Sequence, residues 1–258
     1  MIPIKTRQEV EYMRAACRLA SQILNEISSM LSPGMTTKEV DLAAARLMAD
    51  AGCRSAFLGY KKFPGNICIS LNDEVVHGIG SHRRIQYGDI VQLDIGVILN
   101  GFVGDTAATV PIGEVSEEVQ RLLEVTESAL YAGIEKAREG RRLSVVCAAI
   151  QDAVEQNGFS VVREFVGHGV GRHLHEEPQI PNYRTAGATA KLKAGMTLAI
   201  EPMVNLGKAG VMLLQDNWTV VTADHTPSAH FEHTILVTKG EPEVLTWREK
   251  TSSKLKAG

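Results

Sequence analysis

Residues 88–110 read GDIVQLDIGVILNGFVGDTAATV, and this stretch decides the fold of the chain. Two apolar runs, 89–99 and 102–110, flank the dipeptide Asn100-Gly101. An Asn-Gly pair readily takes the two positive φ values of a type I′ turn, so the segment predicts a β-hairpin.

The residues before this hairpin predict two helices and two short strands. The sequences TRQE and TTKE are possible capping boxes, and the apolar spacing after each predicts helices over residues 6–31 and 36–50. Segments 66–71 and 75–77 are predicted to be strands or strand ends.

The residues after the hairpin repeat this order of elements. They predict two helices and then four short strands: 116–138, 144–157, 159–165, 197–204, 218–222 and 230–237. Gly34 and Gly52 are 18 residues apart, and so are Gly140 and Gly158. The matched spacing favours an internal duplication, although chance remains the alternative because glycines end many helices.

Carboxylates recur at matching places in the two halves. Asp94 ends GDIVQLD and Glu201 ends GMTLAIE, each six residues after a glycine, and Asp105 and Glu232 follow on later strands. We therefore predict an α+β fold in which two helix-helix-sheet halves are related by a pseudo-twofold axis. The halves, 1–112 and 113–250, form a single catalytic domain (1–258) that ends in a short polar tail, 251–258.

Such a fold would bring four carboxylates to one central place. Any one of them alone is more often an edge-strand or turn residue, but four buried like charges repel unless several are protonated or a multivalent cation neutralises them. A cation is the simpler explanation.

Three histidines fit the same site. His168 lies in the glycine-bracketed FVGHGVG, interpreted as a loop in which the backbone can approach a ligand. His175 opens HEEP seven residues later, and His77 occupies a strand end. GHGVG lacks the lysine and glycine spacing of a phosphate-binding loop, so we reject a nucleotide site. The remaining histidines are interpreted as surface or satisfied residues: His82, His173, His225, His230 and His233.

One imidazole with four carboxylates is an oxygen-rich ligand set without thiolate. It suits two Mn²⁺, Fe²⁺ or Co²⁺ ions with bridging carboxylates better than a tetrahedral structural zinc.

Composition excludes several classes of protein. Lys+Arg number 27 and Asp+Glu 30, for a net charge of −3, and 44% of residues are hydrophobic, which is ordinary for a folded globular chain. This balance argues against a nucleic-acid or membrane-surface protein. The N-terminus carries charges where a signal peptide needs an apolar run, and the four cysteines are dispersed, so we expect a cytoplasmic protein.

These residues together resemble the type I methionine aminopeptidases, metallopeptidases with the pita-bread (creatinase/aminopeptidase) fold. The resemblance extends to about Thr246. Five ordered motifs carry it: VVHGIG, GDIVQLDIGVILNGFVGDTA, GHGVGRHLHEEPQIPNY, GMTLAIEPMV and FEHTILVT.

The resemblance implies a dinuclear site. Asp94 would chelate one metal, Asp105 and Glu232 would bridge both, and His168 and Glu201 would complete the second site. The cofactors would be two divalent ions per chain, Mn, Fe, Co or Zn, holding a water that attacks the first peptide carbonyl.

The resemblance also assigns the remaining chemistry. Glu201 would pass a proton to the leaving amine, while His77 and His175 would bind the substrate and stabilise the oxyanion. Binding of the free α-amine to a metal would restrict the enzyme to N-termini.

A methionine pocket is implied around Tyr60, Phe63, Cys68 and Trp218, although such aromatic residues can equally fill a core. Three positions depart from many or some relatives: Phe57 replaces cysteine, Leu174 replaces phenylalanine and Gly96 replaces threonine. Phe57 and Leu174 remain apolar, so they leave methionine preference in place but alter the contour expected for the pocket, whereas Gly96, two residues after Asp94, removes one possible hydrogen bond beside the ligands.

The implied function is removal of the initiator methionine from nascent polypeptides whose second residue is small. The alternatives are an X-prolyl aminopeptidase or dipeptidase of the same fold and a pita-bread binding protein without catalysis. We expect a monomer that contacts neither nucleic acid nor membrane; the sequence leaves a transient ribosome contact open.

Overall fold

In the computed structural model, which describes residues 2–247, both predicted N-terminal helices begin at capping boxes. Helix α1 (Arg7–Met30) starts after Thr6, and α2 (Thr37–Asp50) starts after Thr36. In each box the threonine hydroxyl accepts a hydrogen bond from the backbone N–H of a glutamate three residues later, and that glutamate accepts one from the threonine N–H in return.

The predicted hairpin is confirmed as β4 (Ile90–Leu99) and β5 (Phe102–Pro111), paired without a break from Ile90↔Pro111 to Leu99↔Phe102. Asn100 and Gly101 have φ values of 52° and 77°, as a type I′ turn requires. Strands β1 (Arg54–Ser55) and β2 (Cys68–Leu71) extend this sheet on the other edge of β4.

The later helices are α3 (Glu117–Lys136) and α4 (Leu143–Glu155), close to the predicted ranges. The two helices pack against each other, and α3 contacts β9 of a five-stranded sheet in the order β15-β14-β9-β7-β8. Its strands are β7 (Gly167–Gly169), β8 (Glu176–Ile180), β9 (Thr197–Ile200), β14 (His233–Leu236) and β15 (Glu243–Val244).

Two smaller sheets and one turn complete the described structure. One sheet has the order β13-β10-β6 and the other β11-β12-β3. The first of these sheets consists of β13 (Ser228–His230), β10 (Met203–Asn205) and β6 (Ser160–Val161). The second consists of β11 (Val211–Leu213), β12 (Val220–Thr222) and β3 (Glu74–Val76), and the 3-10 turn is η1 (Tyr60–Lys62).

The interpretation of FVGHGVG as a loop was wrong, because His168 lies on strand β7. A side chain at Gly167 would approach the carbonyl oxygen of Ala199 to 2.4 Å, and one at Gly169 would approach that of Glu177 to 2.2 Å. These glycines therefore allow neighbouring strands to pack closely against β7 rather than opening a loop.

Three predicted strands are also shorter or divided. The predicted strand 159–165 is reduced to β6. The predicted strand 197–204 is split into β9 and β10 at Glu201-Pro202, and 230–237 is split into β13 and β14 at Phe231-Glu232. Because Pro202 has no N–H to donate, it cannot continue a regular ladder.

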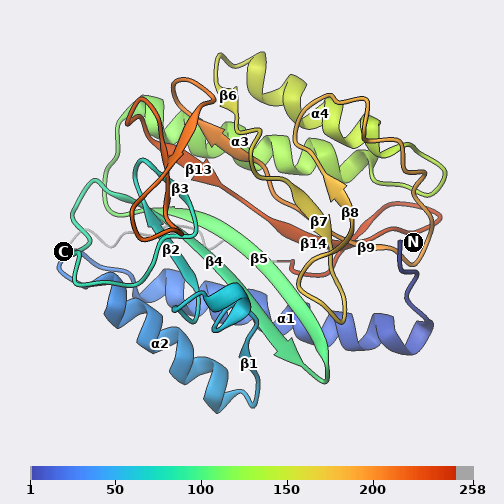
Figure 1. Ribbon diagram of the computed structural model, residues 1–258, viewed down its shortest axis with the longest axis horizontal. Helices are drawn as coiled ribbons and strands as arrows, with labels where there is room; N and C mark the ends of the chain where they lie inside the picture. The colour runs from blue at the N-terminus through green and yellow to red at the C-terminus, as the bar shows by residue number, and fades with distance from the viewer. Residues whose placement is uncertain (1, 248–258) are drawn as a thin grey trace.

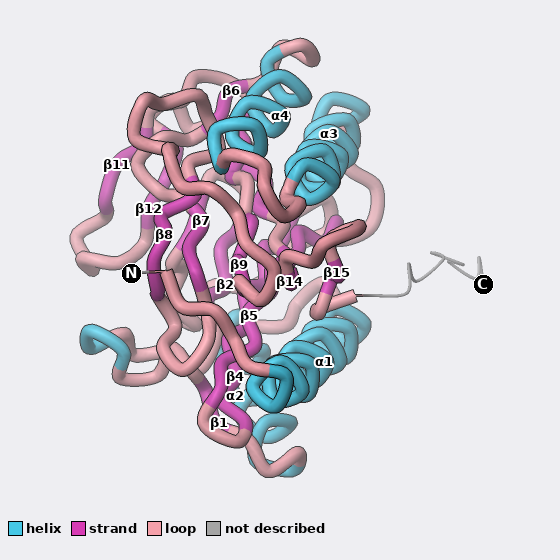
Figure 2. The backbone as a smooth tube through the Cα atoms, turned by 90° about the vertical axis from the view of Figure 1, so that its right-hand side faces the viewer, coloured by secondary structure: helices cyan, strands magenta, loops and turns pink. Residues whose placement is uncertain are grey.

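The helices gather on one side of the strands (Figure 2). In Figure 1, α1 and α2 lie beside β4 and β5, while α3 and α4 lie beside the five-stranded sheet. One buried apolar cluster contains residues of all four helices together with β4, β9 and β14. Among residues 2–247, no helix has the length and apolar character needed to cross a bilayer. The predicted polar tail, 251–258, lies outside the described residues.

Candidate metal centre and its pocket

The hairpin register places Asp94 and Asp105 on one face. Asp94 is opposite Ala107, and Gly96 is opposite Asp105, so the two carboxylates are diagonal neighbours. Asp105 is buried and Asp94 is partly buried. Within the described part of the chain, the Oδ1 atoms of both are buried without a hydrogen-bond partner. Buried unpartnered carboxylate oxygens are costly unless a cation binds them.

His168 directs a ring nitrogen at this cluster. Its Nδ1 lies 2.9 Å from the carbonyl oxygen of Gly169, so Nδ1 carries the donated proton. Its Nε2 lies 3.7 Å from Asp105 Oδ2 and 3.4 Å from Glu201 Oε1. Burial lowers the pKa of His168 to about 3, so the ring is neutral at pH 7. A neutral Nε2 lone pair that faces two carboxylates needs a cation between them.

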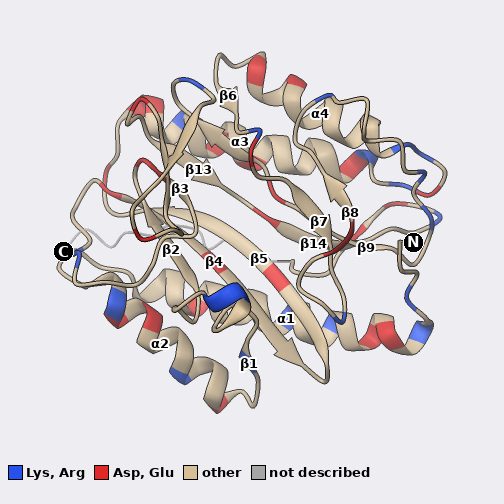
Figure 3. Cartoon of the chain, viewed as in Figure 1, with Lys and Arg blue, Asp and Glu red and all other residues tan. Residues whose placement is uncertain are grey.

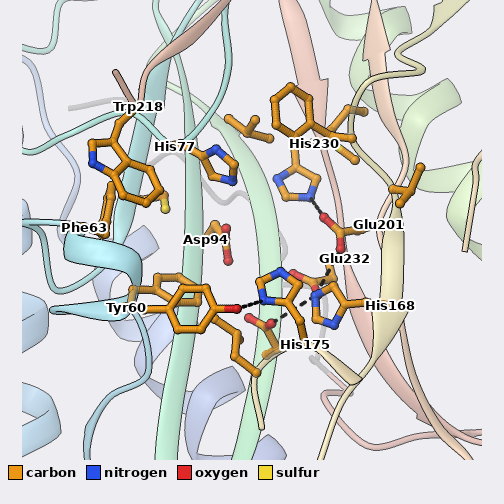
Figure 4. A pocket seen from close by; sticks show the side chains of 18 of the residues that line it. Tyr60, Phe63, His77, Asp94, His168, His175, Glu201, Trp218, His230 and Glu232 are labelled. Atoms are coloured by element: carbon orange, nitrogen blue, oxygen red, sulfur yellow. Dashed lines mark hydrogen bonds and ion pairs between the residues drawn. The ribbon is translucent and has the colours of Figure 1, made fainter. Parts of the chain in front are cut away.

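Glu201 and Glu232 come from the two strand breaks. Figure 4 shows both carboxylates beside the ring of His168. One ligand atom each from Asp105, His168 and Glu232 lie within 4.8 Å of one another, which is close enough for a single ion.

Burial also opposes ionisation of the acids. It raises the pKa of Glu201, of Asp94 and, together with the charges of Asp94 and Glu201, that of Asp105. Several adjacent carboxylates therefore resist ionising together unless positive charge is supplied. Figure 3 shows acidic segments on the central strands β4 and β5 as well as on helices and loops.

The cluster opens into a cavity of about 280 Å³. His77 and His175 stand beside the cluster (Figure 4). His77 follows β3 with φ of 61°, and the Nδ1 of His175 lies 2.9 Å from the hydroxyl of Tyr60. Burial lowers the pKa of His77 to about 4 and also lowers that of His175, so both rings are neutral near pH 7.

The apolar end of the cavity is formed by the residues expected for a methionine pocket. Phe63 meets Trp218 edge-on, with ring centroids 5.1 Å apart. The six predicted apolar positions all line the cavity: Phe57, Tyr60, Phe63, Cys68, Leu174 and Trp218.

The sequence interpretation missed His230. It was assigned to the surface or satisfied histidines, yet it is buried, lines the cavity and has its Nε2 3.5 Å from Glu201 Oε2. Its position two residues before Glu232 on a predicted strand was a usable signal, because residues i and i+2 share a face. His233, in contrast, is buried with hydrogen bonds to Thr246 and Tyr131, as a satisfied histidine should be.

Pita-bread architecture around buried acids and a neutral imidazole defines the class as a metal-dependent hydrolase. The chain belongs to metallopeptidase family M24, whose sequence profile matches residues 11–239.

Named relatives match this chain over nearly its whole length. It is 50% identical to methionine aminopeptidase 1 of Bacillus subtilis over 246 residues, covering 95% of this chain and 99% of that one. A solved methionine aminopeptidase from Thermotoga maritima is 43% identical with a TM-score of 0.94, covering 96% and 100%. The prolidase of Pyrococcus furiosus is 25% identical with a TM-score of 0.78, covering 96% of this chain but 66% of that one.

Proposed function

We propose that this protein removes the N-terminal methionine from polypeptides whose second residue is small, by metal-assisted hydrolysis of the first peptide bond. The observation that carries the proposal is the cavity itself, which is lined by the acid and imidazole cluster and by the apolar side chains of Phe57, Phe63, Cys68, Leu174 and Trp218. The likeness to proteins named methionine aminopeptidase supports it.

Asp94, Asp105, His168, Glu201 and Glu232 are proposed as the residues that would hold two divalent ions, Mn, Fe, Co or Zn. The unpartnered Oδ1 atoms and the Nε2 of His168 fit such ions. Bound ions would supply the positive charge that polarises the peptide carbonyl and acidifies water.

Proton movement is assigned to Glu201. Its carboxylate lines the cavity beside the acid cluster, on the side where a substrate would lie. Such a group can receive a proton from the attacking water and pass it to the leaving amine.

The two neutral histidines are assigned to the substrate oxygen. When the Tyr60 hydroxyl donates to Nδ1 of His175, the ring proton lies on Nε2, where it can be donated into the cavity. His77 stands beside the same space (Figure 4) and would act with it as the second donor.

The apolar end of the cavity is proposed to take the first side chain. This end is lined by the aromatic rings of Tyr60, Phe63 and Trp218 and by the thiol of Cys68. Contacts between sulfur and aromatic rings favour the thioether of methionine at this place.

The proposed organisation is a single catalytic domain formed by halves 1–112 and 113–250, because ligands and core residues come from both. We further propose a cytoplasmic monomer that acts on the N-termini of nascent polypeptides without direct contact with nucleic acid or membrane. A transient ribosome contact is compatible with this role.

The deciding experiment is hydrolysis of Met-Ala-Ser and of Xaa-Pro peptides in the presence of Mn²⁺ or Co²⁺. We expect release of methionine from Met-Ala-Ser. Activity on Xaa-Pro peptides alone would instead assign the X-prolyl class, and no turnover of either would favour a binding protein.

A further inference from the structure

Gly96 leaves a space beside the acid cluster that another residue occupies. It shares the face of β4 that carries Asp94 and lies directly opposite Asp105. A Cβ atom at this position would meet the ring of Phe57 at 2.4, 2.9 and 3.0 Å. The backbone of Gly96 has no positive φ, so any residue could adopt its conformation. Glycine is therefore required here for room and not for its backbone.

The ring of Phe57 is held in this space by its own backbone. The N–H of Ala56 donates to the carbonyl oxygen of Gly96 at 2.9 Å, and the N–H of Phe57 donates to the hydroxyl of Ser55 at 2.9 Å. The same hydroxyl donates to the carbonyl oxygen of Asn66 at 2.6 Å. These hydrogen bonds tie residues 55–57 to β4 on one side and to Asn66 on the other, so the Phe57 ring cannot readily move away from Gly96.

Phe57 also forms part of the cavity wall. It is 7% exposed, packs in one apolar cluster with Phe63, Cys68 and Leu174, and lines the cavity together with Asp94 and Asp105. Phe57 therefore lines the proposed methionine pocket and also lies against Gly96 on strand β4, beside the proposed metal ligand Asp94.

We infer that Phe57 and Gly96 are a size-coupled pair that determines which first side chains the enzyme accepts. The ring fills the space that Gly96 leaves empty and closes the pocket beside the acids. A larger residue at 96 is compatible only with a smaller residue at 57, because the atoms that a side chain at 96 would meet belong to the ring of Phe57. The specificity role rests on the proposed function, because that function identifies methionine as the first residue. The size coupling between Phe57 and Gly96 does not depend on it.

Gly104 provides a matched control on the paired strand. A Cβ atom there would meet backbone atoms of Ala16 at 2.4 Å and of Cys17 at 2.5 Å. Both glycines thus exclude a side chain at similar distances, but only the contact of Gly96 is with a ring that a substitution can remove.

The first measurement is thermal unfolding of the metal-free variants Gly96→Thr, Phe57→Cys, and the two combined. Overpacking should lower the Tm of Gly96→Thr by roughly 3–9 °C, and adding Phe57→Cys should restore at least half of that loss. Phe57→Cys should not restore the loss caused by Gly104→Ala. A double variant no more stable than Gly96→Thr alone would overturn the coupling.

The second measurement compares kcat/KM for Met-Ala-Ser and for the same peptide with ethionine, which is one methylene longer, at position 1. Phe57→Cys should shift the ratio toward ethionine by roughly 10-fold, because one methylene changes discrimination by about that factor. Adding Gly96→Thr should return the ratio toward the wild-type value. An unchanged ratio in Phe57→Cys would refute the specificity role.

The two measurements separate this inference from the proposed function. Wild-type protein that does not cleave Met-Ala-Ser would refute the proposed function, while the unfolding experiment would still decide whether the two residues are coupled. Active wild-type protein with additive Tm changes would refute the coupling alone.

Discussion

Replacement of Lys5 by methionine should destabilise the protein and impair the loop that carries His175. The Nζ atom of Lys5 lies 2.6 Å from Glu176 Oε2, and their side chains are only 5% and 9% exposed. Glu176 Oε1 in turn accepts the N–H of His173, so this carboxylate organises the turn that presents Leu174 and His175 to the cavity.

The burial of this pair sets the size of the effect. Solvent screens the charges little, and removal of one partner of a buried ion pair typically costs roughly 3–5 kcal/mol because the other charge stays buried. For a chain of this length that corresponds to a Tm decrease of roughly 10 °C. Displacement of His175 should also lower kcat on Met-Ala-Ser on the order of 10- to 100-fold, since a small misplacement of a reacting group has that effect.

Two further variants make the experiment decisive. In the double variant Lys5→Met/Glu176→Gln no charge is left buried and the amide oxygen can still accept the N–H of His173, so most of the Tm should return. Arg184→Gln breaks an exposed ion pair with Asp152, with side chains 54% and 46% exposed, and should change the Tm by about 2 °C or less. If Lys5→Met were as mild as Arg184→Gln, or if the double variant were as unstable as the single one, the reasoning would be refuted.

Three further predictions concern the metal site and the pH dependence of stability. Asp105→Ala should abolish turnover and remove the stabilisation that Mn²⁺ gives the wild-type protein, which is roughly 2.7 kcal/mol at 100 times the Kd and is detected as a rise in Tm. Retained turnover in this variant would exclude Asp105 as a ligand. His77 has a folded pKa of about 4, below its unfolded value near 6.5, so the unfolded chain binds more protons and stability falls as the pH drops from 6.5 to 4. In metal-free protein, His77→Gln should reduce that acid loss by on the order of 3 kcal/mol, measured by urea unfolding at both pH values, and an identical loss in the variant would contradict the assignment. The Arg14 guanidinium lowers the pKa of Glu243, so the stabilisation from this ion pair is present above the unfolded pKa near 4.3 and is lost as the pH falls through the folded value. Glu243→Gln should therefore lower the Tm at pH 7 but not at pH 2.5. An equal effect at both pH values would count against this ion pair.

Local signals made much of the fold predictable. The capping boxes at Thr6 and Thr36 and the turn at Asn100-Gly101 depend on residues within four positions, and each forms where the sequence indicated. The hairpin turn also fixed the register, and the register determines that Asp94 and Asp105 share a face. Two of the proposed ligands could therefore be placed together from sequence alone.

Features that depend on distant contacts were not predictable in this way. The glycines around His168 indicated a loop, whereas Gly167 admits the carbonyl oxygen of Ala199, which is 32 residues further along the chain, and Gly169 admits that of Glu177 on the neighbouring strand. Phe57 and Gly96 were both recognised as departures from relatives, but their contact spans 39 residues and could be seen only when the strands were assembled.

The pairing of strands from both halves explains how four acids can reach one place. Within a continuous ladder, side chains alternate between faces, as for Asp94 and Asp105 on the hairpin. Glu201 and Glu232 instead lie where β9 gives way to β10 and β13 to β14, and these strands pair with one another on both sides of the breaks. Ala199 pairs with both His168 and Thr234, and Glu201 and Glu232 each lie two residues from one of these paired positions, so alternation keeps both carboxylates on the face of His168. The N–H of Glu232 donates to the carbonyl oxygen of Ala107 on β5 at 2.9 Å, which ties the second pair of acids directly to the hairpin that carries the first. The cluster is therefore assembled from one regular ladder, β4 with β5, and from two interrupted strand pairs that keep their alternation across the breaks.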